Sequence, residues 1–220
     1  MVQLVPLGFV VEGQCEFDCF QSLVSMVLGV RGLHTKLVNA RGCGNIVMNL
    51  PENLDGLLRA CRPHSVVVSV DLMDCIRQNL CTDCAALRRH LLIQYRQWHA
   101  ARCSDSRYVP LPKNVSVVIQ DKTFETWFLA DPSGMNASGI LAKQLPPDLG
   151  AVDSSIANPC QYLRGFMPPG RGLKNPKTAK QALHHLDASE MRRNSRSFDK
   201  FARDLEQCYA EYLECAGYTA

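Results

Sequence analysis

The chain has 220 residues, of which 46% are apolar and 20% are charged, and its formal net charge is +3. This length allows one main domain with a substantial buried core, and the composition excludes an intrinsically disordered chain. Because the net charge is so small, an argument for nucleic-acid binding must rest on local clusters of charge.

The first predicted unit is a strand, a turn and a helix that place two carboxylates close together. Residues 4–11 are suited to a buried strand, and residues 16–28 carry apolar side chains at helical spacing. Glu12 and Glu16 therefore lie where the strand turns into the helix. Ligands bind at this edge of an open α/β sheet. A turn residue and a first-turn helix carboxylate would explain the same pattern without a ligand.

The middle of the chain predicts a second long strand surrounded by smaller elements. We expect a short strand over residues 34–38, a loop over 42–45 and helices over 52–61 and 83–101. The valine-rich run at 64–71 is typical of a central strand buried on both faces.

Two of the later predicted strands also lead to acidic residues. The valine-rich strand ends at Asp71 and is followed by Asp74, and a strand over residues 114–120 leads to Glu125 in the first turn of a short helix. The carboxyl ends of parallel strands meet at one edge of a sheet, so we expect these acids to lie near Glu12. A helix N-cap or an Asx-turn is the alternative role for Asp71.

The chain divides into a core of residues 1–131 and two later segments. Residues 132–176 are rich in proline and glycine and predict an irregular insertion, and loops of this length are usually functional or mobile. Residues 177–220 predict a helical segment that packs on the core. Within it we expect a helix over 178–186, a basic turn over 191–197 and a final amphipathic helix.

Positive charge is concentrated after Leu163. Phosphate contact is the functional interpretation of this cluster, and solvated surface charge is the alternative. The candidate nucleic-acid-binding residues are Arg171, Lys174, Lys177 and Lys180.

The composition of the chain favours a cytoplasmic protein that does not enter a membrane. Its start lacks the basic region of a signal peptide, and no apolar run approaches the roughly twenty residues that cross a bilayer. The 11 cysteines are odd in number and scattered, which favours reduced thiols. Cys81 and Cys84 have the spacing of a zinc pair, but a second clean pair is missing.

Clustered carboxylates without an obvious nucleophile indicate metal-assisted hydrolysis. Hard oxygen ligands select Mg²⁺ or Mn²⁺, and such ions serve phosphoryl chemistry. The candidate metal ligands are Glu12, Glu16, Asp71, Asp74 and Glu125. The candidate catalytic residues are Glu12, Asp71, Glu125 and the cation Lys177.

The predicted acids lie in three motifs, which are Val-Glu-Gly-x-x-Glu at 11–16, Val-Val-Val-Ser-Val-Asp at 66–71 and Gln-Asp-Lys-Thr-Phe-Glu-Thr-Trp-Phe-Leu-Ala-Asp at 120–131. These motifs resemble the bacterial domain-of-unknown-function family 4276. Asn-Pro-Lys at 175–177 and the basic segment at 191–201 resemble the tail of that family. The resemblance therefore covers most of the chain.

This resemblance implies a Toprim-like α/β fold with a mostly parallel central sheet, flanking helices, a loop-rich insertion and a C-terminal helix. Relatives of the family include nucleases of the overcoming-lysogenisation-defect type, whose genes commonly neighbour an ABC-type ATPase in antiphage defence operons. The implied protein is a Mg²⁺-dependent nuclease with a nucleic acid substrate and an ATPase partner.

The resemblance also assigns the acids to the Toprim motifs. Glu12 matches the first glutamate, Asp71 and Asp74 the second acidic motif, and Glu125 the later acid. The usual second motif is Asp-x-Asp, whereas this chain has one more residue between the two aspartates, which puts the role of Asp74 in question.

Two functions of different classes follow from these observations. The first is the metal-dependent nuclease, and the second is a non-catalytic subunit that uses residues 132–176 to dock on an ATPase. A zinc-stapled structural protein would be a third. The choice between DNA and RNA, the trigger and the formation of a homo-oligomer are left open by the sequence.

Overall fold

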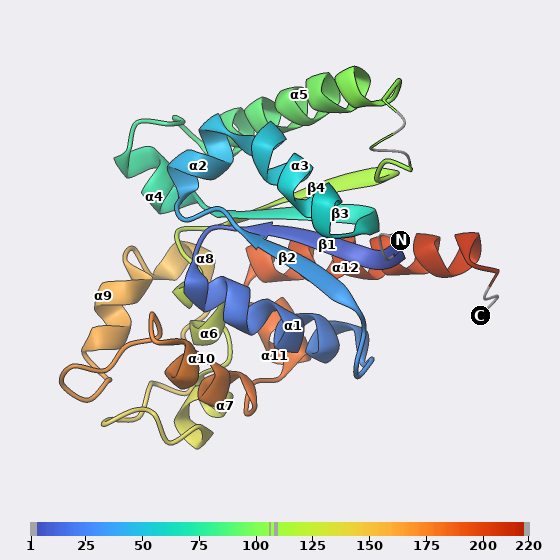
Figure 1. Ribbon diagram of the computed structural model, residues 1–220. Coiled ribbons are helices and arrows are strands. Elements are labelled where there is room, and N and C mark those ends of the chain that lie inside the picture. Colours follow the sequence, from blue (N-terminus) through green and yellow to red (C-terminus); the bar gives the residue numbers. More distant parts are fainter. Residues whose placement is uncertain (1–3, 106, 108–109, 218–220) are drawn as a thin grey trace.

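A four-stranded parallel β-sheet lies at the centre of the computed structural model, which describes residues 4–105, 107 and 110–217 (Figure 1). Its strands are β1 (Leu4–Val11), β2 (Thr35–Asn39), β3 (Arg62–Asp71) and β4 (Asn114–Gln120). Their order is β2-β1-β3-β4, and every neighbouring pair is parallel. The predicted α/β class and its parallel sheet are confirmed.

The strand order reverses between β1 and β3. From β1 the chain first adds β2 on one side and then crosses over to place β3 and β4 on the other side. In an open parallel sheet, such a reversal leaves a crevice beyond the carboxyl ends of the two central strands. Glu12 directly follows β1 and Asp71 is the last residue of β3, so both lie at this crevice.

Helices cover both faces of the sheet. They are α1 (Gln14–Leu28), α2 (Cys43–Met48), α3 (Leu50–Ala60), α4 (Leu72–Arg77), α5 (Cys84–Arg102), α6 (Glu125–Leu129), α7 (Pro132–Ala137), α8 (Val152–Ser155), α9 (Pro159–Arg164), α10 (Pro176–Leu183), α11 (Ala188–Asn194) and α12 (Arg196–Cys215). Figure 1 shows α2 to α5 on one side of the sheet, and α1 with α6 to α12 on the other. None of the helices in the described part of the chain combines the length and the apolar character needed to cross a membrane.

The valine run of β3 supplies both cores. Val66, Val68 and Val70 belong to the buried cluster beneath α3 and α5, whereas Val67 belongs to the cluster on the opposite face. Successive side chains of a strand point to opposite faces, so a strand buried on both sides needs a continuous apolar run.

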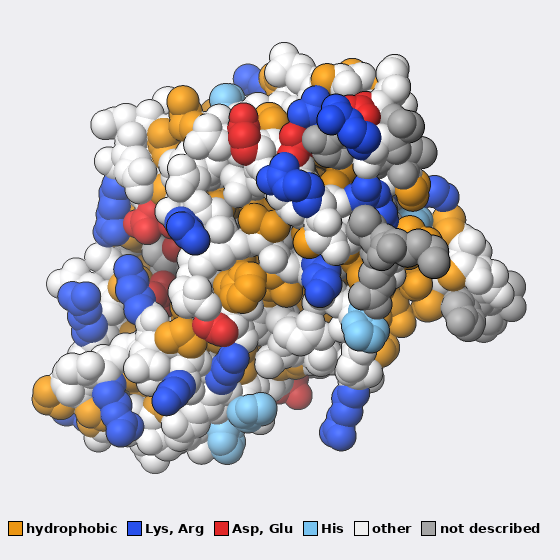
Figure 2. All heavy atoms as spheres, viewed as in Figure 1, with side chains coloured by type: hydrophobic (Ala, Val, Ile, Leu, Met, Phe, Trp, Pro, Cys, Tyr) orange, Lys and Arg blue, Asp and Glu red, His pale blue; other side chains and the backbone are white. Residues whose placement is uncertain are grey.

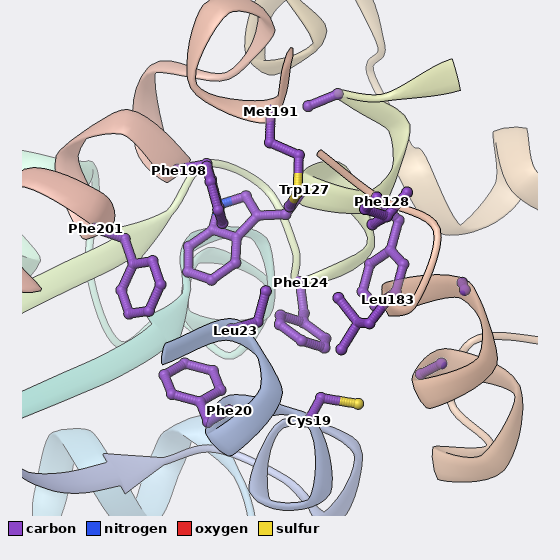
Figure 3. Close-up of a cluster of buried hydrophobic side chains, with 14 of the residues drawn as sticks. Cys19, Phe20, Leu23, Phe124, Trp127, Phe128, Leu183, Met191, Phe198 and Phe201 are labelled. Atoms are coloured by element: carbon purple, nitrogen blue, oxygen red, sulfur yellow. The ribbon is translucent and has the colours of Figure 1, made fainter. Parts of the chain in front are cut away.

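The larger core joins segments that are far apart in the sequence. Phe20 of α1, Trp127 of α6 and Phe201 of α12 pack together, with ring centroids 5.6 Å apart for Phe20–Phe201 and 5.0 Å for Trp127–Phe201 (Figure 3). The indole N–H of Trp127 donates a hydrogen bond of 2.9 Å to Oγ of Ser197. The C-terminal helix therefore packs on the sheet and on α6, and the Ser197 amide at its start donates to the Asp153 carboxylate of the insertion at 2.8 Å.

Two expectations about local structure were wrong. The loop expected over 42–45 is largely the first turn of α2, which begins after Gly42. The basic turn expected over 191–197 is mostly α11, because the Asp187 carboxylate accepts hydrogen bonds from the amides of Ser189 and Glu190 and caps a helix there. The insertion of residues 132–176 contains the short helices α7, α8 and α9.

Candidate metal centre

Glu12 and Asp71 meet where β1 and β3 end. The amide of Asp71 donates a hydrogen bond of 3.1 Å to Oε2 of Glu12. Asp71 occupies the N-cap position of α4, but its carboxylate makes no capping hydrogen bond. Its Oδ1 is buried and has no hydrogen-bond partner among the described residues. Within the described residues, neither a capping hydrogen bond nor a partner for Oδ1 accounts for the burial of this carboxylate.

Asp74 reaches the same place because α4 begins immediately after Asp71. A helix returns to the same side after one turn, so the third residue of α4 lies back toward the strand end. One carboxylate oxygen from each of Glu12, Asp71 and Asp74 lies within 4.8 Å of the other two. The extra residue between the aspartates thus does not separate them. Arg77, one turn further on, pairs with Asp74 at 3.3 Å.

Two neutral hydrogen-bond donors hold the Glu16 carboxylate in place. Its Oε2 accepts a hydrogen bond of 2.7 Å from the Gly13 amide, and its Oε1 accepts one of 2.8 Å from the side chain of Gln120. Gln120, the last residue of β4, also donates to Oγ of Ser69 at 2.8 Å. Glu16 therefore closes the first turn of α1 and is tied to the carboxyl end of β4.

Glu125 completes the acidic site from α6. It is only 8% exposed and lines the same cavity of about 230 Å³ as Glu12, Glu16, Asp71 and Asp74. The five predicted metal ligands are therefore brought together. Glu12, Asp71 and Asp74 alone form the close group defined above, among the residues that the structure describes.

Burial of several carboxylates together disfavours their ionised forms. Desolvation, opposed in part by the Asp71 amide, raises the pKa of Glu12 to about 7. Desolvation and the charge of Glu12 raise the pKa of Glu16 to about 8. Burial and the neighbouring charges of Glu16 and Glu12 raise the pKa of Asp71 well above its ordinary value. A cation in the cavity would reverse this effect.

The donor set fits a hard divalent cation. It offers carboxylate oxygens from the turn after β1, from β3 and from α4, and Oδ1 of Asp71 is a buried acceptor that lacks a partner among the described residues. Oxygen ligands of this kind suit Mg²⁺ or Mn²⁺. Glu12, Asp71 and Asp74 would hold the ion, while Glu16 and Glu125 line the cavity around it.

The predicted cations lie in different places. Lys174 lines the acidic cavity. Lys177 is exposed on the first turn of α10 and is not among the described residues that line this cavity. Lys180 pairs with Asp18 at 3.6 Å. Arg171 lines an adjacent cavity instead. Of the four, Lys174 is the one placed to act beside the carboxylates, although the sequence favoured Lys177.

Two cysteines in the acidic cavity were not predicted. The Cys15 thiol donates to the carbonyl oxygen of Leu173 at 2.8 Å. Desolvation and the charge of Glu125 raise the pKa of Cys160 to about 11, so this thiol is protonated at neutral pH and is a poor nucleophile. No spacing signal marks either residue, because they come from α1 and α9 and meet only in the folded chain.

The zinc alternative gains no support from the geometry. Cys84 is exposed and Cys81 is half-buried. Within the described ranges, neither belongs to a group of three or more side chains that could ligate a metal ion.

The fold and the site define an α/β protein with a carboxylate-lined crevice at the switch point of a parallel sheet. The model of the family described as "Domain of unknown function (DUF4276)" matches residues 11–206, so the chain belongs to this family, as its motifs predicted. Neither the curated proteins nor the solved structures contain a match to the chain.

Proposed function

We propose that this protein is a Mg²⁺- or Mn²⁺-dependent nuclease with a Toprim-like core that hydrolyses phosphodiester bonds in the cytoplasm. The observation that supports this most directly is the convergence of Glu12, Asp71 and Asp74 within 4.8 Å at the switch point of the sheet. The pKa values raised by burial and the orphaned Asp71 oxygen add to it, because functional sites are where such perturbed groups cluster.

The chain's own residues would each have a distinct part in this reaction. In phosphodiester hydrolysis, positive charge beside the phosphate and activation of the attacking water would be supplied by the bound divalent ion. The Asp71 amide orients Glu12, and Gln120 holds Glu16. Lys174, at the rim shared with the neighbouring cavity, would add positive charge beside the phosphate oxygens.

The proposed biological setting comes from the family resemblance. We expect the nuclease to be the effector of an antiphage defence system, controlled by an ABC-type ATPase partner. The alternative is a non-catalytic subunit that docks on such an ATPase through residues 132–176. The two proposals differ in whether the acidic site binds a metal ion.

A cleavage assay combined with metal titration tests the proposal. Single-stranded and duplex DNA and RNA are incubated with the protein in Mn²⁺, Mg²⁺ or EDTA, and Mn²⁺ binding is measured by calorimetry. Glu12→Gln and Asp71→Asn should abolish cleavage. Glu52→Gln, an exposed first-turn carboxylate of α3, is the matched control and should cleave normally.

Normal cleavage by both Glu12→Gln and Asp71→Asn would contradict the nuclease proposal. Absence of saturable Mn²⁺ binding, together with a stable ATPase complex, would favour the docking subunit.

A further inference from the structure

A second, larger cavity adjoins the acidic site. It measures about 640 Å³ and is formed by α9 and the loop that leads to α10. Glu125, Cys160 and Lys174 line both cavities, so the two adjoin at these side chains. A ligand in the larger cavity would therefore lie next to the acidic site.

The larger cavity is lined by cations without carboxylate partners. Arg164, Arg171 and Lys174 are exposed, and none of them has an acid within ion-pair distance among the described residues. Most surface cations of α11 and α12 are paired instead, as Arg192 is with Asp199 at 3.1 Å. Figure 2 shows Lys and Arg side chains on both sides of a hollow, on the left of the view, that contains carboxylates. Glu125 is the one carboxylate among the lining residues of the larger cavity.

The same cavity has an apolar wall. Leu163, Met167 and Leu173 line it and are largely buried, while Pro168 and Pro169 form the turn that follows α9. The Arg171 amide donates to the Pro168 carbonyl at 3.1 Å, which closes this turn. Phosphate binding alone would need only the cations. The apolar wall therefore indicates a ligand with both an anionic and a poorly hydrated part, and a nucleotide has both.

We propose that this cavity binds an unpaired nucleotide of the nucleic acid strand whose neighbouring phosphate enters the acidic site. This inference rests on the proposed nuclease function and names its substrate class as single-stranded or locally unpaired nucleic acid. The base would lie against Met167 and Leu163. Arg164, Arg171 and Lys174 would contact the phosphates on either side of it.

The size of the cavity suits a single unpaired nucleotide. Its volume of about 640 Å³ lies within the range of about 300–1,000 Å³ that small-molecule sites occupy. In a duplex the base would have to leave the stack before it could enter, which costs free energy. An unpaired strand avoids this cost.

Strand binding in EDTA tests the inference without cleavage. Fluorescence anisotropy is measured with labelled oligothymidine and oligouridine of about twelve nucleotides, with an abasic strand of equal length and with a duplex. At least one base-bearing strand should bind about tenfold more tightly than the abasic strand, which carries the same phosphates, because the apolar wall removes part of the base from water. Comparison of the two base-bearing strands shows whether DNA or RNA is preferred.

Variants then locate the binding. Arg164→Ala and Arg171→Ala should each reduce the slope of log K against log salt concentration by about one. Arg89→Ala, on the exposed side of α5, is the matched control and should leave the slope unchanged. Equal affinity for base-bearing and abasic strands would overturn the inference, and so would unchanged slopes in both cavity variants.

The outcome is separable from that of the proposed function. Base-dependent binding without any cleavage in Mn²⁺ would overturn the nuclease and leave the nucleotide site intact. Cleavage in Mn²⁺ without base-dependent binding would overturn the nucleotide site alone.

Discussion

The Asp71 amide donates its hydrogen bond to Oε2 of Glu12, a residue 59 positions earlier in the chain. This contact links the ends of β1 and β3 at the point where the strand order reverses. It also fixes the orientation of the Glu12 carboxylate while leaving Oδ1 of Asp71 without a partner in the described part of the chain. The hydrogen bond thus holds the Glu12 carboxylate beside that of Asp71, where both can bind the same ligand.

Mn²⁺ should stabilise the protein through these carboxylates. An ion that binds only the folded state raises the free energy of unfolding by about 2.7 kcal/mol at a concentration of one hundred times its Kd. Asp71→Asn should remove this stabilisation, because it removes one ligand of the close group. Thermal unfolding with and without Mn²⁺ measures the effect. Glu52→Gln should retain the full stabilisation, and a Tm increase of equal size in Asp71→Asn would refute the assignment.

The metal-free protein should become less stable as the pH rises. The folded pKa of Glu12 is raised from 4.5 to about 7 and that of Glu16 from 4.5 to about 8, so the folded state holds more protons than the unfolded state between these values. The free energy of unfolding must then fall from about pH 4.5 to about pH 8, by several kcal/mol. Urea titrations in EDTA at several pH values measure this slope.

The variant Glu12→Gln provides the control for the pH dependence. Its neutral amide cannot ionise, so the slope should become flatter, and the remaining part should reflect Glu16 and Asp71. Saturating Mn²⁺ should stabilise the wild type more at pH 8 than at pH 5.5, because the ion competes with protons for the carboxylates. Stability that rises from pH 5 to pH 8 in EDTA would contradict the burial argument.

The position of Glu12 and Asp71 could be predicted because strand ends are visible in the sequence. The apolar runs of β1 and β3 stop at these acids, and parallel strands bring their carboxyl ends to one edge. Asp74 was expected near Glu12, but its role was in question, because its position depends on α4 beginning directly at Leu72. The sequence also could not show that Lys174 lines the acidic cavity in place of Lys177, because the loop before α10 has no periodicity that would orient its side chains.

Gln120 should be needed to keep Glu16 in place. It is fully buried and its amide donates to both Glu16 and Ser69. Gln120→Leu would leave these acceptors without their donor, which costs about 1–3 kcal/mol for a buried group. Because Glu16 would then be free to shift toward the acidic cavity, Mn²⁺ affinity should fall by about tenfold.

Denaturant unfolding and Mn²⁺ calorimetry measure the two effects of Gln120→Leu. Gln207→Leu is the matched control, since Gln207 is exposed on α12 and its side-chain amide donates to Oε1 of Glu211 at 3.0 Å. It should change the stability by less than about 0.5 kcal/mol. Unchanged Mn²⁺ affinity in Gln120→Leu would show that Glu16 does not support the metal site.

Lys174 and Lys177, three positions apart, should differ sharply in their effect on cleavage. Lys174 lines both the acidic cavity and its larger neighbour, and its charge opposes the rise in the pKa of Glu12. Lys177 lies at the start of α10, where its amide donates to Oδ1 of Asn175 at 2.9 Å.

Lys174→Ala should lower kcat/KM by about a hundredfold, the loss expected when one group that stabilises transition-state charge is removed. Lys177→Ala should leave kcat/KM within about twofold of the wild type, because a solvated charge outside the cavity contributes only to long-range attraction. Initial cleavage rates at several salt concentrations separate transition-state stabilisation from long-range attraction. A larger loss of kcat/KM in Lys177→Ala than in Lys174→Ala would support Lys177 as the catalytic cation, as the sequence predicted.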